Sequence, residues 1–129
     1  MSCGDGRIEA ALAGLGYPGT DPLDLPADLG LSIRTDWGPA QVGGLRMLAA
    51  LDGTTIRVYR RGIEERAAET GTDPSHLERM AIAHEVIHAI ALQRGIPADE
   101  ATVRRLARAW AEAHDGTGGE TLGVRPAAP

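Results

Sequence analysis

We expect an α+β protein in which a small, mostly antiparallel sheet packs on a buried helix and on the helix that follows it. Three observations predict this fold. Residues 81–92 are almost wholly apolar and long enough for a buried helix. Residues 45–59 alternate apolar and polar side chains around the dipeptide Asp52-Gly53, as a hairpin does. Residues 98–114 repeat apolar side chains with the period of an amphipathic helix.

The composition is that of one globular domain. The chain has 129 residues, 43% of them hydrophobic, but no Phe and only 3% aromatics. The core must therefore be aliphatic, with Trp37 and Trp110 as its large anchors. We place the domain at residues 7–114. Residues 115–129 are rich in Gly, Pro, Ala and Thr, and we expect them to be a disordered tail.

The charge argues against direct nucleic-acid binding, which needs a basic face, because the net charge is −5. The pairs Arg60-Arg61 and Arg104-Arg105 are short and are typical of a solvated surface. Cys3 is the only cysteine, which fits a reducing compartment. The N-terminus lacks the pattern of a signal peptide, and polar residues interrupt the longest apolar stretch. We therefore expect a cytoplasmic protein with no membrane partner.

The first third of the chain predicts two short helices and a strand. Residues 7–15 have helical apolar spacing and are followed by Gly16, a natural helix stop. A second short helix is expected over residues 23–29, closed by Gly30. Residues 31–34 then alternate apolar and polar, as a half-buried strand does.

The middle of the chain predicts a hairpin. Two strand-like runs, residues 45–51 and 54–59, are separated by Asp52-Gly53, a strong signal for a two-residue turn. Together with the strand before them they form a sheet of about three strands. The charged residues 60–71 are compatible with either a short helix or a loop.

The buried helix has clear boundaries. Asp73-Pro74 is typical of an N-cap followed by proline at the first helical position. Ser75-x-x-Glu78 is an overlapping alternative start, a capping box. Either predicts a helix that ends before Gly95.

This helix contains the pattern His84-Glu85-Val86-Ile87-His88. Histidines four apart lie on one helical face, at the spacing that seats two imidazole nitrogens on one Zn²⁺. Glu85 lies off that line, where it can act as the general base on a water molecule. The alternative is a pair of core histidines that form hydrogen bonds with backbone or carboxylate groups.

Zinc needs at least a third protein ligand, and Glu100 is the best candidate. It shares an inward helical stripe with Val103, Ala107 and Trp110, although it could simply favour the first turn of its helix. Asp99 is the next candidate, on a less inward face.

The remaining histidines are weaker candidates. His114 and Asp115 lie further along the chain and are expected to cap the helix end. His76 lies two turns before His84, where it either lines the cleft or faces solvent.

Residues 79–89, Arg-Met-Ala-Ile-Ala-His-Glu-Val-Ile-His-Ala, resemble the R-f-t-l-A-H-E-l-g-H core of the ImmA/IrrE-type metallopeptidases. Residues 100–107 resemble the E-x-x-A-x-x-F-A stretch of the helix that follows in that family. Residues 24–31 resemble its lead-in, and residues 45–59 resemble its small sheet. The resemblance implies a minimal zincin-like fold. It also implies Zn²⁺ held by His84, His88 and an acidic residue of the next helix, with Glu85 as general base.

The expected function is therefore zinc-dependent hydrolysis of a peptide bond in a protein or peptide substrate. The resemblance implies that the substrate is a partner repressor encoded nearby. One alternative is a zinc-binding regulatory or interaction domain without turnover, associated with a phage or a toxin–antitoxin pair. Another is a structural domain that binds no metal.

Overall fold

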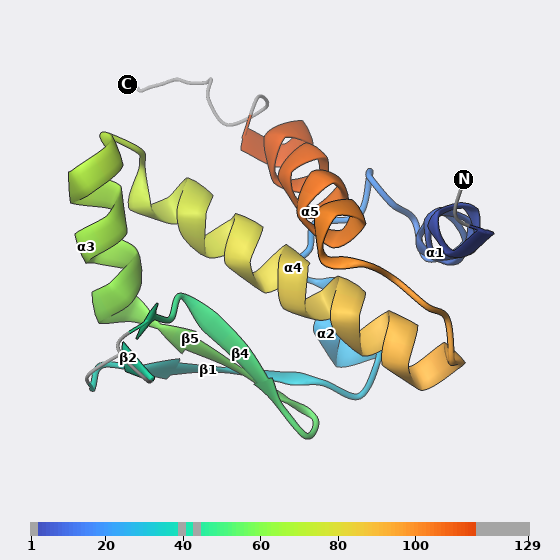
Figure 1. The fold of residues 1–129 in the computed structure, drawn as a ribbon, viewed down its shortest axis with the longest axis horizontal. Helices are drawn as coiled ribbons and strands as arrows, with labels where there is room; N and C mark the ends of the chain where they lie inside the picture. Colours follow the sequence, from blue (N-terminus) through green and yellow to red (C-terminus); the bar gives the residue numbers. More distant parts are fainter. Residues whose placement is uncertain (1–2, 39–40, 43–44, 116–129) are drawn as a thin grey trace.

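Helix α4 lies across one face of a small sheet and contacts most other elements of the protein (Figure 1). The computed structural model describes residues 3–38, 41–42 and 45–115. Helix α4 (Pro74–Arg94) packs against the sheet on one side and against α5 (Glu100–Asp115) on another. The protein is therefore α+β, as expected. No helix in the described ranges is both long and apolar enough to cross a bilayer.

The remaining elements are short and precede α4. They are α1 (Cys3–Gly14), α2 (Leu25–Asp28), β1 (Ser32–Asp36), β2 (Gln41–Val42), β3 (Leu45–Arg46), β4 (Ala49–Asp52), β5 (Thr55–Tyr59) and α3 (Arg60–Thr70). Helix α1 begins at Cys3, earlier than the expected residue 7. Of residues 60–71, for which the sequence is compatible with helix or loop, residues 60–70 form α3 and Gly71 is its C-cap. The predicted tail lies outside the described residues, except Asp115, which ends α5.

The main sheet is mixed, with strand order β1-β5-β4. Strand β5 pairs antiparallel with β4 and parallel with β1, so that Ser32 and Asp52 both face Thr55. The prediction of a mostly antiparallel sheet is wrong for this sheet, because half of its pairings are parallel. After β1 the chain forms the separate β2–β3 pair and then β4. Strand β5 follows, lies between β4 and β1, and runs parallel to β1.

The β4–β5 hairpin is present, one residue away from the expected position. Asp52 pairs with Thr55, so Gly53 and Thr54 form the turn. Gly53 has φ 62°, which a glycine adopts without steric cost. The expected single strand over residues 45–51 is divided into β3 and β4.

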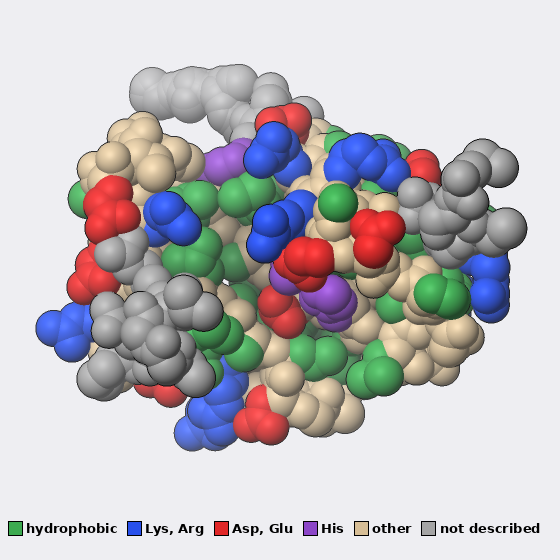
Figure 2. Space-filling view, in the orientation of Figure 1, with side chains coloured by type: hydrophobic (Ala, Val, Ile, Leu, Met, Phe, Trp, Pro, Cys, Tyr) green, Lys and Arg blue, Asp and Glu red, His purple; other side chains and the backbone are tan. Residues whose placement is uncertain are grey.

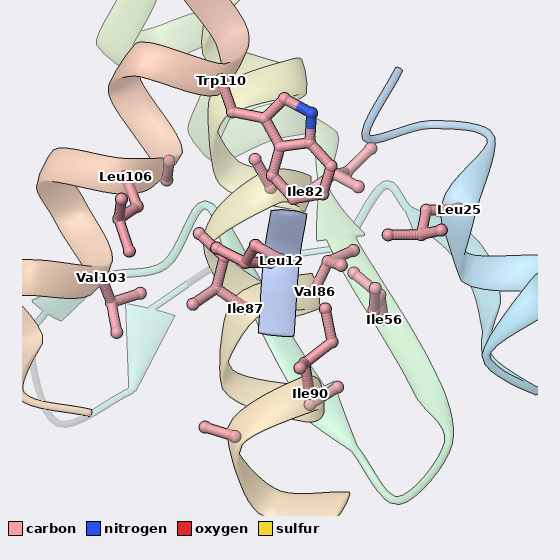
Figure 3. Close-up of a cluster of buried hydrophobic side chains, with 14 of the residues drawn as sticks. Leu12, Leu25, Ile56, Ile82, Val86, Ile87, Ile90, Val103, Leu106 and Trp110 are labelled. Atoms are coloured by element: carbon pink, nitrogen blue, oxygen red, sulfur yellow. The ribbon is translucent and has the colours of Figure 1, made fainter. Parts of the chain in front are cut away.

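The core is aliphatic around one tryptophan (Figure 3). Trp110 is fully buried, with Val103 and Ala107 of the same α5 stripe. Trp37 is 63% exposed, so its predicted role as a core anchor is wrong. It directly follows β1, an edge strand, where no neighbouring strand covers it within the described chain.

Helix α4 has the predicted ends. Asp73 accepts a hydrogen bond at Oδ1 from the Ser75 backbone N–H at 2.8 Å, and Pro74 is the first helical residue. Gly95 ends the helix with φ 63°. The helix therefore has the Asp73 cap and not the capping box.

Replacing Asp73 with alanine is expected to lower the free energy of unfolding by about 1 kcal/mol, because it leaves the Ser75 N–H without its side-chain acceptor. Urea denaturation followed by circular dichroism measures the change. Asp73→Asn is the matched control, since its amide oxygen can still accept the bond. An unchanged stability of Asp73→Ala would contradict the assigned cap.

Candidate metal centre

Two imidazoles lie together on the exposed side of an otherwise buried part of α4. The ring centroids of His84 and His88 are 4.7 Å apart, with an angle of 78° between the ring planes. Both side chains are partly exposed, whereas Val86 and Ile87 between them are fully buried. The helical spacing therefore turns both histidines toward the same surface while the apolar residues hold α4 in the core.

Glu100 approaches both histidines from the first residue of α5. Its Oε2 lies 2.7 Å from His84 Nε2, and its Oε1 lies 3.1 Å from His88 Nε2. The side chain is 47% exposed, so it is at the edge of the α5 stripe and is not turned fully inward as expected. The short connection from α4 to α5 brings together residues that are 12 positions apart.

These three side chains have the donor set and the proximity of a metal site. One potential ligand atom from each of His84, His88 and Glu100 lies within 4.8 Å of the others. Two imidazole nitrogens and a carboxylate oxygen are ligands that Zn²⁺ takes in catalytic sites, where a fourth position holds water or substrate. The residues present therefore fit the zinc ion that the sequence predicts.

Glu85 contacts His84 at Nδ1, the ring nitrogen on the side away from Glu100. Its Oε2 lies 2.9 Å from His84 Nδ1, and its side chain is 12% exposed. A carboxylate in that position holds the ring and its tautomer, and leaves Nε2 available for a metal. Glu85 thus has two possible roles, as a proton acceptor and as a group that orients His84.

The charges of the site favour a cation between the carboxylates. The hydrogen bond with Glu85 raises the pKa of the His84 imidazole above its ordinary value; burial opposes this, and Glu100 adds to it. Burial raises the pKa of Glu100, but the hydrogen bonds and charges of His84 and His88 outweigh it, so the net shift is downward. Either a proton or a metal ion on His84 would offset the negative charges of Glu85 and Glu100.

Asp99, the alternative third ligand, is used elsewhere. Its Oδ1 accepts the Thr102 backbone N–H at 2.7 Å, and the Val103 N–H donates to its carbonyl. The hydrogen bond from the Thr102 backbone holds the pKa of Asp99 below its usual value. Asp99 therefore caps α5 and is not part of the candidate metal group of His84, His88 and Glu100.

The other two histidines lie away from the group. His114 places Nε2 2.9 Å from the Pro18 carbonyl oxygen, close to the expected end of α5. His76 is half-buried and is not among the described residues that line the cleft below. The structure therefore brings together His84, Glu85, His88 and Glu100 among the predicted site residues.

A cleft of about 690 Å³ is lined by His84 and Glu100 of the candidate metal group and by Glu85. Helix α4 contributes His84 and Glu85, while α3, α5 and the chain entering β4 contribute the remaining walls. Arg104 is one of its lining residues and donates from Nε to Glu100 Oε2 at 3.1 Å. Arg104 is 72% exposed, in agreement with its predicted place on a solvated surface. Its position four residues after Glu100 on a helix is also a signal for this contact.

Searches against protein-family models, curated proteins and solved structures found no match. The likeness to the ImmA/IrrE-type metallopeptidases therefore depends on the sequence motifs.

Proposed function

We propose that this protein is a zinc-dependent metallopeptidase that cleaves a protein or peptide substrate. One observation carries the proposal: His84, His88 and Glu100 converge from two helices, with Glu85 against His84. The H-E-x-x-H spacing and the resemblance to ImmA/IrrE-type enzymes support the same function. The resemblance also supports a partner repressor as the substrate.

The residues of the chain have separate roles in this proposal. His84, His88 and Glu100 would hold the metal. A bound Zn²⁺ supplies Lewis acidity and lowers the pKa of water toward about 7. Glu85 accepts the proton from the attacking water and later donates it to the leaving amine. Because Oε2 of Glu85 is engaged with His84, the second carboxylate oxygen is the one available for the proton.

The edge of the sheet supports an extended substrate. Strand β4 pairs with β5 on one side only, among the described strands, and Ala49 at its start lines the cleft. An edge strand has backbone groups that can pair with an added chain. A peptide beside β4 would pass along the cleft toward His84.

Metal content tests the proposal. Protein purified without chelator is expected to hold about one zinc per chain, and chelation is expected to lower the midpoint of thermal unfolding, because a ligand at a thousandfold excess over its Kd stabilises by about 4 kcal/mol. The double variant His84→Ala/His88→Ala should bind no zinc and should not respond to chelator. Less than about 0.2 zinc per chain would contradict any zinc-dependent function and leave the metal-free structural domain.

A second candidate is a zinc-binding regulatory domain without turnover, and the position of Glu85 favours it. A carboxylate that is hydrogen-bonded to Nδ1 of His84 can serve to orient that ring, a role that requires no proton transfer. Incubating the zinc-loaded protein with the repressor encoded nearby separates the two candidates. Cleavage supports the peptidase, whereas binding without cleavage supports the regulatory domain.

A further inference from the structure

Three arginines line the cleft beside the candidate metal centre. Arg66 comes from α3, and Arg104 and Arg108 come from α5, so positive charge lies on both sides of the α4 floor. Figure 2 shows basic side chains gathered next to histidine and acidic side chains near the centre of this face. This is a local departure in a chain whose net charge is −5.

Two of these arginines have no ion-pair partner within the described part of the chain. Arg66 and Arg108 form no ion pair with any residue that the structure describes. Arg104 is paired with Glu100. The two glutamates that line the cleft, Glu85 and Glu100, are both hydrogen-bonded to His84. The positive charge that remains available to a ligand therefore belongs to the arginines.

The rest of the lining suits a peptide better than a nucleic acid. The apolar side chains of the cleft are aliphatic or Met, namely Met47, Leu48, Ala49, Leu77, Met80, Ala81 and Ala107. No Phe, Tyr or Trp is among the described lining residues, so the cleft lacks the large ring platforms on which bases usually stack. The edge of β4 offers backbone groups to an extended chain.

We infer that the cleft selects peptides with acidic side chains close to the bond that is cleaved, an inference that rests on the proposed peptidase function. Glu100, Arg104 and Arg108 follow one another at intervals of four along α5. The helical rise therefore places the two arginines about 6 and 12 Å beyond Glu100 along the axis. At about 3.3 Å per residue of an extended peptide, the distance to Arg108, which is not paired with Glu100, corresponds to an acidic side chain roughly four residues from that bond.

The test compares two fluorescein-labelled ten-residue peptides of the same sequence, one with Glu at four positions and one with Gln there. Fluorescence anisotropy measures their binding to the zinc-loaded Glu85→Gln variant, so that turnover does not interfere. The Glu peptide is expected to bind about tenfold more tightly at low salt, the effect of two exposed ion pairs. Adding Arg66→Gln/Arg108→Gln is expected to reduce the preference to within about twofold.

A matched double variant controls for overall charge. Arg34→Gln/Arg61→Gln also removes two exposed arginines, but neither lines the cleft, so the preference for the Glu peptide should persist. Equal binding of the two peptides, an equal loss in both double variants, or no binding of either peptide would overturn the inference. Tighter binding of a labelled ten-nucleotide oligothymidylate than of the Glu peptide would also overturn it. If only the proposed peptidase function is wrong, the variant would still bind the Glu peptide more tightly, but the wild-type protein would not cleave it.

Discussion

Glu85→Gln is expected to slow peptide hydrolysis by about 100- to 10,000-fold, the contribution of a positioned general base. Zinc content should stay at the wild-type level, because Glu85 is not one of the three proposed ligand residues. The amide oxygen of glutamine can still accept the hydrogen bond from His84 Nδ1, which preserves the ring position. Turnover of the proposed repressor substrate and metal analysis of the same preparation measure the two quantities.

Glu112→Gln is the matched control, since it removes the same charge from an exposed position of α5. Its activity should equal that of the wild-type protein. Full cleavage by Glu85→Gln with zinc still bound would show that Glu85 is not the general base. A fall in zinc content would instead assign Glu85 the task of orienting His84.

Glu100→Ala is expected to weaken zinc binding by more than about 100-fold, because loss of an outer-shell partner alone can cost that much. Asp99→Ser should retain wild-type affinity, because serine can replace the cap that Asp99 provides to the Thr102 N–H. Competition with a chromophoric chelator gives both affinities.

Glu100 is half-exposed, so its loss should leave the fold intact, which circular dichroism checks. If Asp99→Ser lost zinc and Glu100→Ala kept it, the assignment of the third ligand would be reversed. If both variants kept it, a two-histidine site with an undescribed ligand would remain.

The parts of the fold that depend on local chemistry were predictable from the sequence. The start of α4 at Asp73-Pro74 and its end at Gly95 are set by capping and by backbone conformation within a few residues. The proximity of His84 and His88 follows in the same way from helical spacing.

Features that depend on distant contacts could not be read in this way. The parallel pairing of β1 with β5 joins strands about 23 residues apart, and nothing in either strand specifies its direction. Trp37 is exposed because it lies beyond the end of an edge strand, although a large apolar side chain of this type is usually mostly buried.

In the candidate site, too, some contacts follow from local sequence and others depend on how distant elements pack. The contact of Arg104 with Glu100 was available from their spacing of four on a helix. The position of Arg66 in the same cleft was not, because it depends on how α3 packs against α4.

The C-terminal half of α5 is anchored to the turn at residues 17–20. The Trp110 indole N–H donates to the Thr20 carbonyl at 2.7 Å, and the Tyr17 ring packs on Trp110 at 5.2 Å. Glu100 lies ten residues before Trp110, about 15 Å away along the helix axis. A tilt of α5 by about 4° around Trp110 would therefore move Glu100 by about 1 Å. A displacement of that size can cost about 100-fold in rate. The turn at residues 17–20 is remote in sequence from His84, His88 and Glu100, yet its contacts with Trp110 help to hold α5, and with it Glu100, in place.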